Sequence, residues 1–255
     1  MRDSSVFKDL PVIVFQSGYY DFQKEISVLA QIHTQAHQVL KLLIPKNQHV
    51  ILYYTPQKGL PSVDIAVDIE AAGELIWLFE DKASGTESVH VSLDVRLIGE
   101  RAMLEANGIY QLTDHARGTY SLKVAHEASY TYSHVTYAGI IRGHAKAVFA
   151  AKAVISPHLQ GVEAHQSNKN LLRSHTAEVI TRPELEIDSE DVKCSHGATV
   201  GQLDPEALFY LTSRGLSESM AMDLLERAFL VFIQEKLDQE KLDQEKLENF
   251  LRKEN

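Results

Sequence analysis

Alternating apolar and polar residues run through most of this chain of 255 residues. Between Val63 and Ile69, valine and isoleucine occupy every second position, and residues 89–97 repeat the pattern with valine and leucine. A period of two places these apolar side chains on one face of a β-strand. The alternation therefore predicts that residues 12–201 fold as a succession of short strands, each with one buried face.

Further candidate strands follow from the same reasoning and lie at residues 75–79, 104–112, 120–126, 130–137, 147–155, 177–187 and 191–200. Neighbouring runs begin about a dozen residues apart, a spacing that suits a sandwich, a barrel or a solenoid. Small residues gather between positions 138 and 153 and tight hairpin signals are few, which favours coils stacked in parallel. Periodicity leaves residues 21–44 open, because their apolar spacing also fits one helix.

The last part of the chain has a helical pattern. Asp204 followed by Pro205 predicts a helix start, and Gly215 predicts its end. Ser217 can cap a second helix, whose apolar stripe consists of Met220, Leu224, Leu225, Ala228, Phe229 and Phe232. This stripe suits either packing against the chain's own β core or binding of a partner.

Composition excludes several classes of function. A net charge of −10 without a basic run argues against nucleic-acid binding. A single cysteine excludes an intrachain disulfide and fits a reducing compartment. The first residues lack the apolar region of a secretory signal, and the longest apolar run, Ala228 to Ile233, is too short to span a membrane. We therefore expect a soluble, cytoplasmic protein, and the missing P-loop motif predicts that the chain binds no ATP.

The single cysteine, Cys194, stands two residues before His196. In an extended strand both side chains would lie on one face, roughly 6.6 Å apart along the backbone. Thiolate and imidazole are ligands suited to iron–sulfur chemistry or zinc. Two ligands do not close a metal site, so such a site would need groups from elsewhere, including another chain. The alternative is a half-buried structural thiol beside a strand histidine.

The residues around this pair belong to a larger set of motifs. They lie at 143–149, 166–172, 177–179, 181–187, 191–201 and 209–216, and together with the apolar helix that follows they cover about 85 residues in good register. Together they closely resemble the SufB/SufD family, the scaffold subunits of the SUF machinery for iron–sulfur cluster assembly. The form Cys194-Ser-His196-Gly-Ala-Thr is similar to the SufD branch. Asn168 stands where the SufB branch carries its cluster-building cysteine, which also indicates the SufD branch.

The resemblance implies a mainly β fold, with a right-handed parallel β-helix core and a C-terminal α-helical segment. The core would comprise residues 1–202 and the helical segment residues 203–255. Near Val39 to Tyr54 the resemblance implies strands, the alternative to one helix over residues 21–44. The N-terminal helical region of the family is expected to be short or absent in this sequence.

The resemblance also implies a non-catalytic scaffold that pairs with SufB by joining the two β-helices edge to edge. His196 would face the cysteine of SufB at that junction. It would assist assembly of a nascent iron–sulfur cluster as a transient iron ligand or proton acceptor, with Cys194 as a weaker candidate. The cluster is transient and shared with SufB. An isolated chain is expected to form a homodimer through the same edge.

The helical segment is expected to dock SufC, the ATPase of the system. The residues implied in that docking are Phe209, Leu224, Leu225, Ala228 and Phe229.

A second hypothesis rests on three carboxylates. Glu184, Glu186 and Asp188 alternate with apolar residues and would share one strand face. Many β-helix enzymes act on polysaccharides, and paired carboxylates about 5 to 9 Å apart can hydrolyse glycosides. The alternative is a solvated strand face, which half-exposed strands commonly show.

Overall fold

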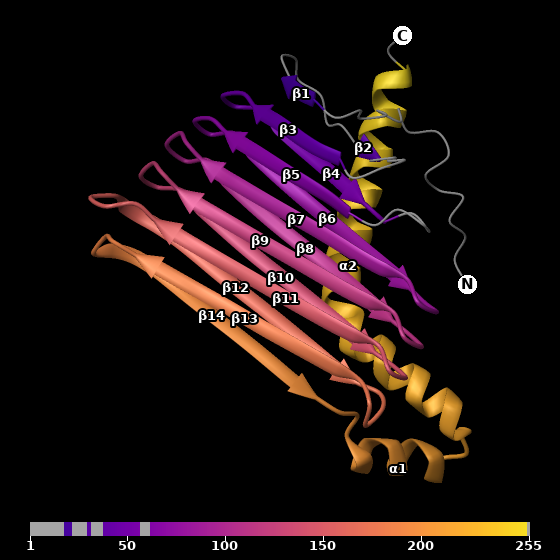
Figure 1. Cartoon of the computed structure of the whole chain (residues 1–255). Coiled ribbons are helices and arrows are strands. Elements are labelled where there is room, and N and C mark those ends of the chain that lie inside the picture. Colours follow the sequence, from indigo (N-terminus) through magenta and orange to yellow (C-terminus); the bar gives the residue numbers. More distant parts are fainter. Residues whose placement is uncertain (1–17, 22–29, 32–37, 57–61, 254–255) are drawn as a thin grey trace.

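The computed structural model describes residues 18–21, 30–31, 38–56 and 62–253. Consecutive strands alternate between two seven-stranded parallel sheets, which lie face to face (Figure 1). Sheet A has the order β1-β3-β5-β7-β9-β11-β13, and sheet B has the order β14-β12-β10-β8-β6-β4-β2. This arrangement is a parallel β-solenoid, which confirms the expected fold class.

The strands of sheet A are β1 (Gly18–Asp21), β3 (Gln38–Ile44), β5 (Ser62–Ile69), β7 (Ser88–Leu97), β9 (Arg117–His126), β11 (Lys146–Ile155) and β13 (Glu178–Ile187). The strands of sheet B are β2 (Ala30–Gln31), β4 (His49–Tyr54), β6 (Glu74–Ala83), β8 (Met103–Leu112), β10 (Tyr132–Ile141), β12 (Gln160–Leu172) and β14 (Asp191–Gly201).

Two details differ from the sequence-based expectation. The helix considered for residues 21–44 is wrong where the structure describes them, because Gln38–Ile44 is strand β3; the rest of that segment lies mostly outside the described residues. Strand β12 was not among the predicted strands. Its inward positions carry Gln166, Asn168 and Asn170, so it lacks the apolar alternation that marks the other strands.

The corners between the sheets are built from an unusual backbone conformation. Between the sheet A strand and the next sheet B strand, one non-glycine residue has a positive φ in coil after coil: Asn47, Ala72, Arg101, Tyr130 and His158. Few residues other than glycine and asparagine favour this region. The recurrence at one corner shows that the stacking of the coils holds these residues in place.

Aromatic side chains fill the interior of the solenoid. Trp77, Phe79, Tyr110, Tyr120 and Phe149 are the largest buried side chains. Tyr110 and Tyr120 stack with ring centroids 4.6 Å apart. The interior becomes more polar towards the last coils, where it includes Ser133, Gln166, Asn168 and Asn170.

Two buried titratable groups lie inside this core and respond to pH in opposite directions. Asp81 accepts a hydrogen bond from the Tyr120 hydroxyl at 2.5 Å, and burial raises the pKa of Asp81 to about 6. The ring nitrogens of His126 lie 2.7 Å from Thr131 Oγ1 and 2.9 Å from Ser133 Oγ, and burial lowers the pKa of His126 to about 4. Acid therefore favours folding through Asp81 and opposes it through His126.

Single substitutions should reveal these opposing contributions. Asp81 contributes fully to the free energy of unfolding below its unfolded pKa of 3.8, and this contribution is lost as the pH rises to about 6. The contribution of His126 is complete above 6.5 and is lost as pH falls to about 4. Each is on the order of 3 kcal/mol, so they largely cancel. As the pH falls from 6.5 to 4, the free energy of unfolding of Asp81→Asn should decrease relative to that of the unsubstituted chain. Over the same range, that of His126→Asn should increase relative to the unsubstituted chain. Urea unfolding across this range measures both slopes, and two curves parallel to the unsubstituted chain would contradict the assignment.

Two helices follow the solenoid. Helix α1 (Pro205–Ser213) begins at Asp204, whose carboxylate accepts a hydrogen bond from the Glu206 amide at 2.9 Å. Helix α2 (Glu218–Lys253) runs back across the outer face of sheet B (Figure 1). Within the described residues, no helix is long and apolar enough to cross a membrane.

The contact between α2 and the sheet differs from the predicted apolar stripe. The described part of α2 buries Ala221, Glu226, Leu230 and Ile233. Of the stripe residues, Leu225 and Phe229 are half-buried, whereas Met220, Leu224, Ala228 and Phe232 are exposed. The helix therefore rests on the sheet beside its apolar stripe and leaves much of that stripe facing outward.

Candidate functional site

Strand β14 carries the candidate site and is the last strand of sheet B. It pairs with β12 on one side, and its other side is a free edge of the solenoid beside the last strand of sheet A, β13 (Figure 1). Residues 195–201 of β14 are exposed and contain neither proline nor a permanently charged side chain. Strand β13 instead contains Pro183 and alternating charges, features that protect a strand edge from pairing. Strand β14 is thus the less protected edge.

Cys194 lies on the inward side of β14. It packs beside Ala164 of β12 and joins a small apolar cluster with Ala153, Ile155 and Val162. The thiol is half-buried, and burial raises the pKa of Cys194 above its ordinary value. In the isolated chain the thiol is therefore protonated at neutral pH, which makes it a poor ligand until a partner or metal changes its surroundings.

His196 follows on the same side of the strand but is exposed, because no further coil covers it. Its partner across the ladder is Gln166, which is buried. With its amide oriented so that both groups find partners, the Gln166 side chain donates to the Ala151 carbonyl at 3.1 Å and accepts from the Ala153 amide at 2.9 Å, and so links the two sheets. His196 thus lies next to a buried, hydrogen-bonded polar side chain at the open end of the solenoid. The structure brings Cys194 and His196 together on one strand face, as the sequence predicted.

The described residues contain no group of three or more histidine, cysteine, aspartate or glutamate side chains arranged to hold a metal ion. Cys194 and His196 supply at most two ligands, and a tetrahedral iron site needs four. An iron–sulfur cluster built here, as cargo of the protein, would need ligands besides these two residues.

Asn168 has a structural role in the interior. It is buried and donates hydrogen bonds to the Tyr110 hydroxyl at 3.1 Å and to the Tyr137 carbonyl at 3.4 Å. Its own amide oxygen accepts from Asn170 Nδ2 at 2.6 Å. A side chain that is fully hydrogen-bonded in this way stabilises the last coils and offers no thiol for chemistry.

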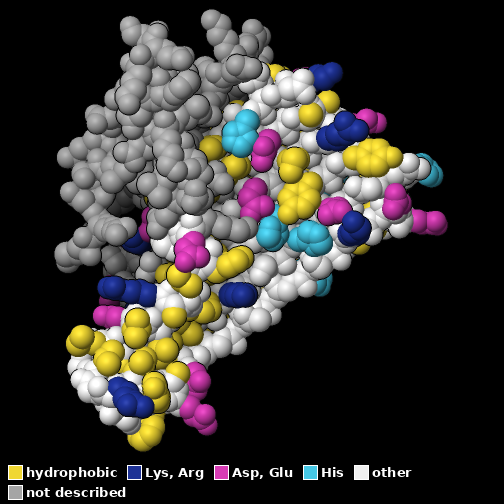
Figure 2. Space-filling model, turned by 180° about the vertical axis from the view of Figure 1, so that it is seen from behind, with side chains coloured by type: hydrophobic (Ala, Val, Ile, Leu, Met, Phe, Trp, Pro, Cys, Tyr) yellow, Lys and Arg dark blue, Asp and Glu magenta, His cyan; other side chains and the backbone are white. Residues whose placement is uncertain are grey.

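The residues expected to dock a partner lie on the two helices. Phe209 is 73% exposed, and Leu224 and Ala228 are also exposed, whereas Leu225 and Phe229 are half-buried. Tyr210, Met220 and Val231 enlarge the exposed apolar surface. Figure 2 shows apolar side chains gathered on this helical end of the molecule.

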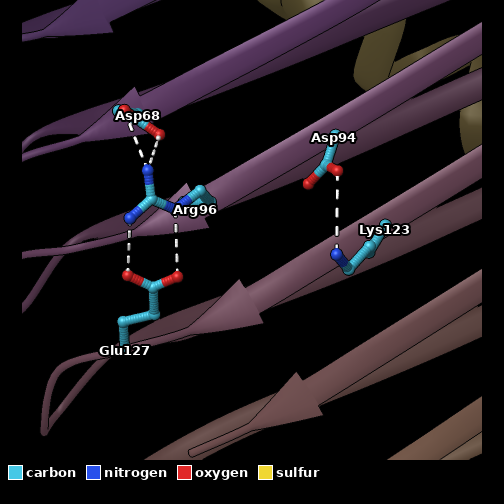
Figure 3. A network of polar contacts seen from close by, with 5 residues as sticks. All are labelled: Asp68, Asp94, Arg96, Lys123 and Glu127. Carbon is cyan, nitrogen blue, oxygen red and sulfur yellow. Dashed lines mark hydrogen bonds and ion pairs between the residues drawn. The ribbon is translucent and has the colours of Figure 1, made fainter.

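The three carboxylates of the second hypothesis lie at the end of β13 and just beyond it, on the charged outer surface of sheet A. On this face, carboxylates pair with basic side chains: Arg96 Nη2 lies 2.9 Å from Glu127 and Arg96 Nη1 lies 3.3 Å from Asp68 (Figure 3). Glu186 follows the same pattern, because Lys152 lies 2.6 Å away and lowers its pKa. A general acid for glycoside hydrolysis needs the opposite shift. The geometry gives this hypothesis no support.

Comparison with known proteins identifies a family and several relatives. The chain matches the family described as SUF system FeS cluster assembly, SufBD core domain, over residues 26–229. It is 34% identical to the iron–sulfur cluster assembly protein SufD of Escherichia coli over 142 residues, which are 56% of this chain and 34% of that protein.

Two further relatives match parts of the chain. An iron–sulfur cluster assembly SufBD family protein of Synechocystis is 46% identical over 90 residues, which are 35% of this chain and 20% of that protein. The chloroplastic protein ABCI7 of Arabidopsis thaliana is 25% identical over 216 residues, which are 78% of this chain and 42% of that protein. The chain thus matches less than half the length of each of these relatives. It belongs to the SufBD core domain family of the SUF system for iron–sulfur cluster assembly.

Proposed function

We propose that this chain is a SufD-type, non-catalytic scaffold subunit of the cytoplasmic SUF machinery. It pairs with SufB to form the interface at which iron–sulfur clusters are built, and it docks the ATPase SufC. The observation that carries the proposal is the position of His196 and Cys194 on the exposed edge strand β14, where the part of the chain that the structure describes offers too few ligands for a cluster.

The pairing follows from the state of the two end strands. A free strand edge presents unpaired backbone donors and acceptors, and addition of a strand from a second chain satisfies them. The exposed uncharged run 195–201 and Val200, which is 48% exposed, favour β14 as the contact strand. A second solenoid placed there would continue sheet B and cover His196. Without SufB, a second copy of this chain would use the same edge and form a homodimer.

The roles of the two side chains differ because their surroundings differ. His196 is exposed and free to contact a partner cysteine, either as a transient iron ligand or as the acceptor of its proton. Cys194 is half-buried with a raised pKa, so it is the weaker candidate for direct ligation. The cluster is transient cargo shared with SufB.

Docking of SufC is assigned to the exposed apolar surface of the helices, with Phe209, Leu224 and Ala228 at its centre and Leu225 and Phe229 at its margin. Exposed aromatic and aliphatic groups in one area are typical of a protein-binding surface.

Co-purification tests both contacts at once. Tagged chain co-expressed with SufB and SufC should form a stable ternary complex. Leu224→Glu should reduce SufC recovery at least about tenfold while SufB is retained, because a charge would have to be desolvated in the interface. Size-exclusion chromatography with light scattering gives the stoichiometry. A monodisperse chain that binds neither SufB nor SufC would refute the proposal.

A further inference from the structure

We infer that Glu226 selects which face of helix α2 packs against the solenoid, and thereby which apolar face remains outward. The inference concerns this chain alone; only its consequence for SufC rests on the proposed function.

The apolar residues of α2 do not define the observed buried face. At about 100° per residue, the apolar side chains between positions 220 and 233 cover roughly three-fifths of the helix circumference. The middle of that arc lies near Ala228 and Phe232, which are exposed, and near Ala221, which is buried in the first turn of the helix. The side that packs against sheet B lies roughly 120° away and is formed by Glu226, Leu230 and Ile233 with half-buried Phe229. Burial of apolar area alone would turn the helix towards the middle of the arc.

A buried ionic cluster accounts for the difference. Glu226 is only 7% exposed and accepts hydrogen bonds from Arg142 Nη2 and Arg173 Nε. Arg142 follows the end of β10 and Arg173 follows the end of β12, so the two guanidinium groups come from the same corner of successive coils. Arg173 Nη2 also lies 3.0 Å from Met222 Sδ, one helical turn before Glu226. Turning the helix would separate the carboxylate from both cations.

The surroundings leave room for such a turn. A groove of about 600 Å³ runs beside α2, between Gln111 and Ile140 of the sheet and the helix, and its helical wall includes Glu226, Leu230 and Val231. A helix with open space on one flank is not fixed by close packing there. Buried ion pairs are best attested as devices that fix one register among several of similar apolar burial. Glu226 acts here as such a positioning residue.

Thiol accessibility tests the inference directly, because Cys194→Ser leaves a chain without cysteine. Ala228→Cys introduces a thiol on the outward face, and Leu230→Cys introduces one on the buried face. With Glu226 intact, the thiol at 228 should react with a maleimide at least about 100-fold faster than the thiol at 230. With Glu226→Met, we expect the rate at 230 to rise and the rate at 228 to fall, each by about tenfold or more. Glu235→Met, at an exposed acid of the same helix, should change neither rate.

Other outcomes would overturn the inference. Unchanged rates in Glu226→Met would mean that packing alone fixes the helix. Full reactivity at both positions would mean that Glu226 anchors the helix without selecting its face. Circular dichroism shows in each case whether the helix persists. Because no partner is present, the result is independent of the proposed function. If both hold, Glu226→Met should also weaken SufC binding by about tenfold, since the surface around Leu224 would turn inward.

Discussion

His196→Ala is expected to reduce iron–sulfur cluster assembly by the SUF complex by about 10- to 100-fold. The imidazole is exposed on the inward side of the last strand, where a partner stacked on β14 would cover it. Its loss would remove one ligand or proton acceptor from the shared site and would leave the fold intact, because the side chain is not part of the core. Reconstitution followed by visible absorption and transfer to an apo-ferredoxin measures the effect.

His165→Ala is the matched control. His165 lies on the neighbouring strand β12 but on the outer face, where Nδ1 is 2.7 Å from the Ser195 hydroxyl. Assembly should stay within about twofold of the unsubstituted complex in this variant, because the outer face is not part of the proposed interface. Equal losses in both variants would show that a general disturbance of β14, and not the imidazole at position 196, causes the effect.

Val200→Asp is expected to weaken pairing with SufB by at least about 100-fold while the isolated chain stays folded. Val200 is 48% exposed in the single chain, so a carboxylate there remains solvated. A second solenoid stacked on β14 would bury that carboxylate without a counter-ion. Binding of SufB by isothermal titration calorimetry gives the change in affinity.

Val39→Asp provides the comparison, because Val39 is 45% exposed on β3, near the other end of the solenoid. It should leave SufB affinity unchanged. The same Val200→Asp variant should still bind SufC through the helices. Retention of SufB by Val200→Asp at full affinity would show that β14 is not buried in the pair.

Much of the solenoid could be predicted from the sequence because its inward positions follow a simple alternation. The runs at Val63 to Ile69 and at 89–97 coincide with β5 and β7. The corners could not be predicted, because Ala72, Arg101 and Tyr130 adopt positive φ values that local preferences disfavour. Strand β12 was missed for a related reason: its inward polar residues form hydrogen bonds with Tyr110, with Tyr137 and with the opposite sheet, which are distant in sequence.

For the candidate site and the neighbouring helix, too, some features could be predicted from the sequence and others could not. The common face of Cys194 and His196 follows from the two-residue period of a strand, and their place at a free edge was expected from the family resemblance. The face of α2 that packs against sheet B could not be predicted from the sequence. Helical spacing identified an apolar stripe, but Glu226 gives no signal in the sequence that it will be buried between Arg142 and Arg173. Those arginines are brought to one corner only by the stacking of two coils.

Hydrogen–deuterium exchange of β14 tests the central claim most directly. At a concentration low enough to keep the chain monomeric, the free edge should allow rapid exchange of those amides in residues 194–201 that do not bond to β12. Addition of SufB should slow their exchange by about 100-fold or more, and the corresponding segment of β3 should not change. A stable complex with SufB in which exchange across residues 194–201 stays as fast as in the monomer would contradict the account.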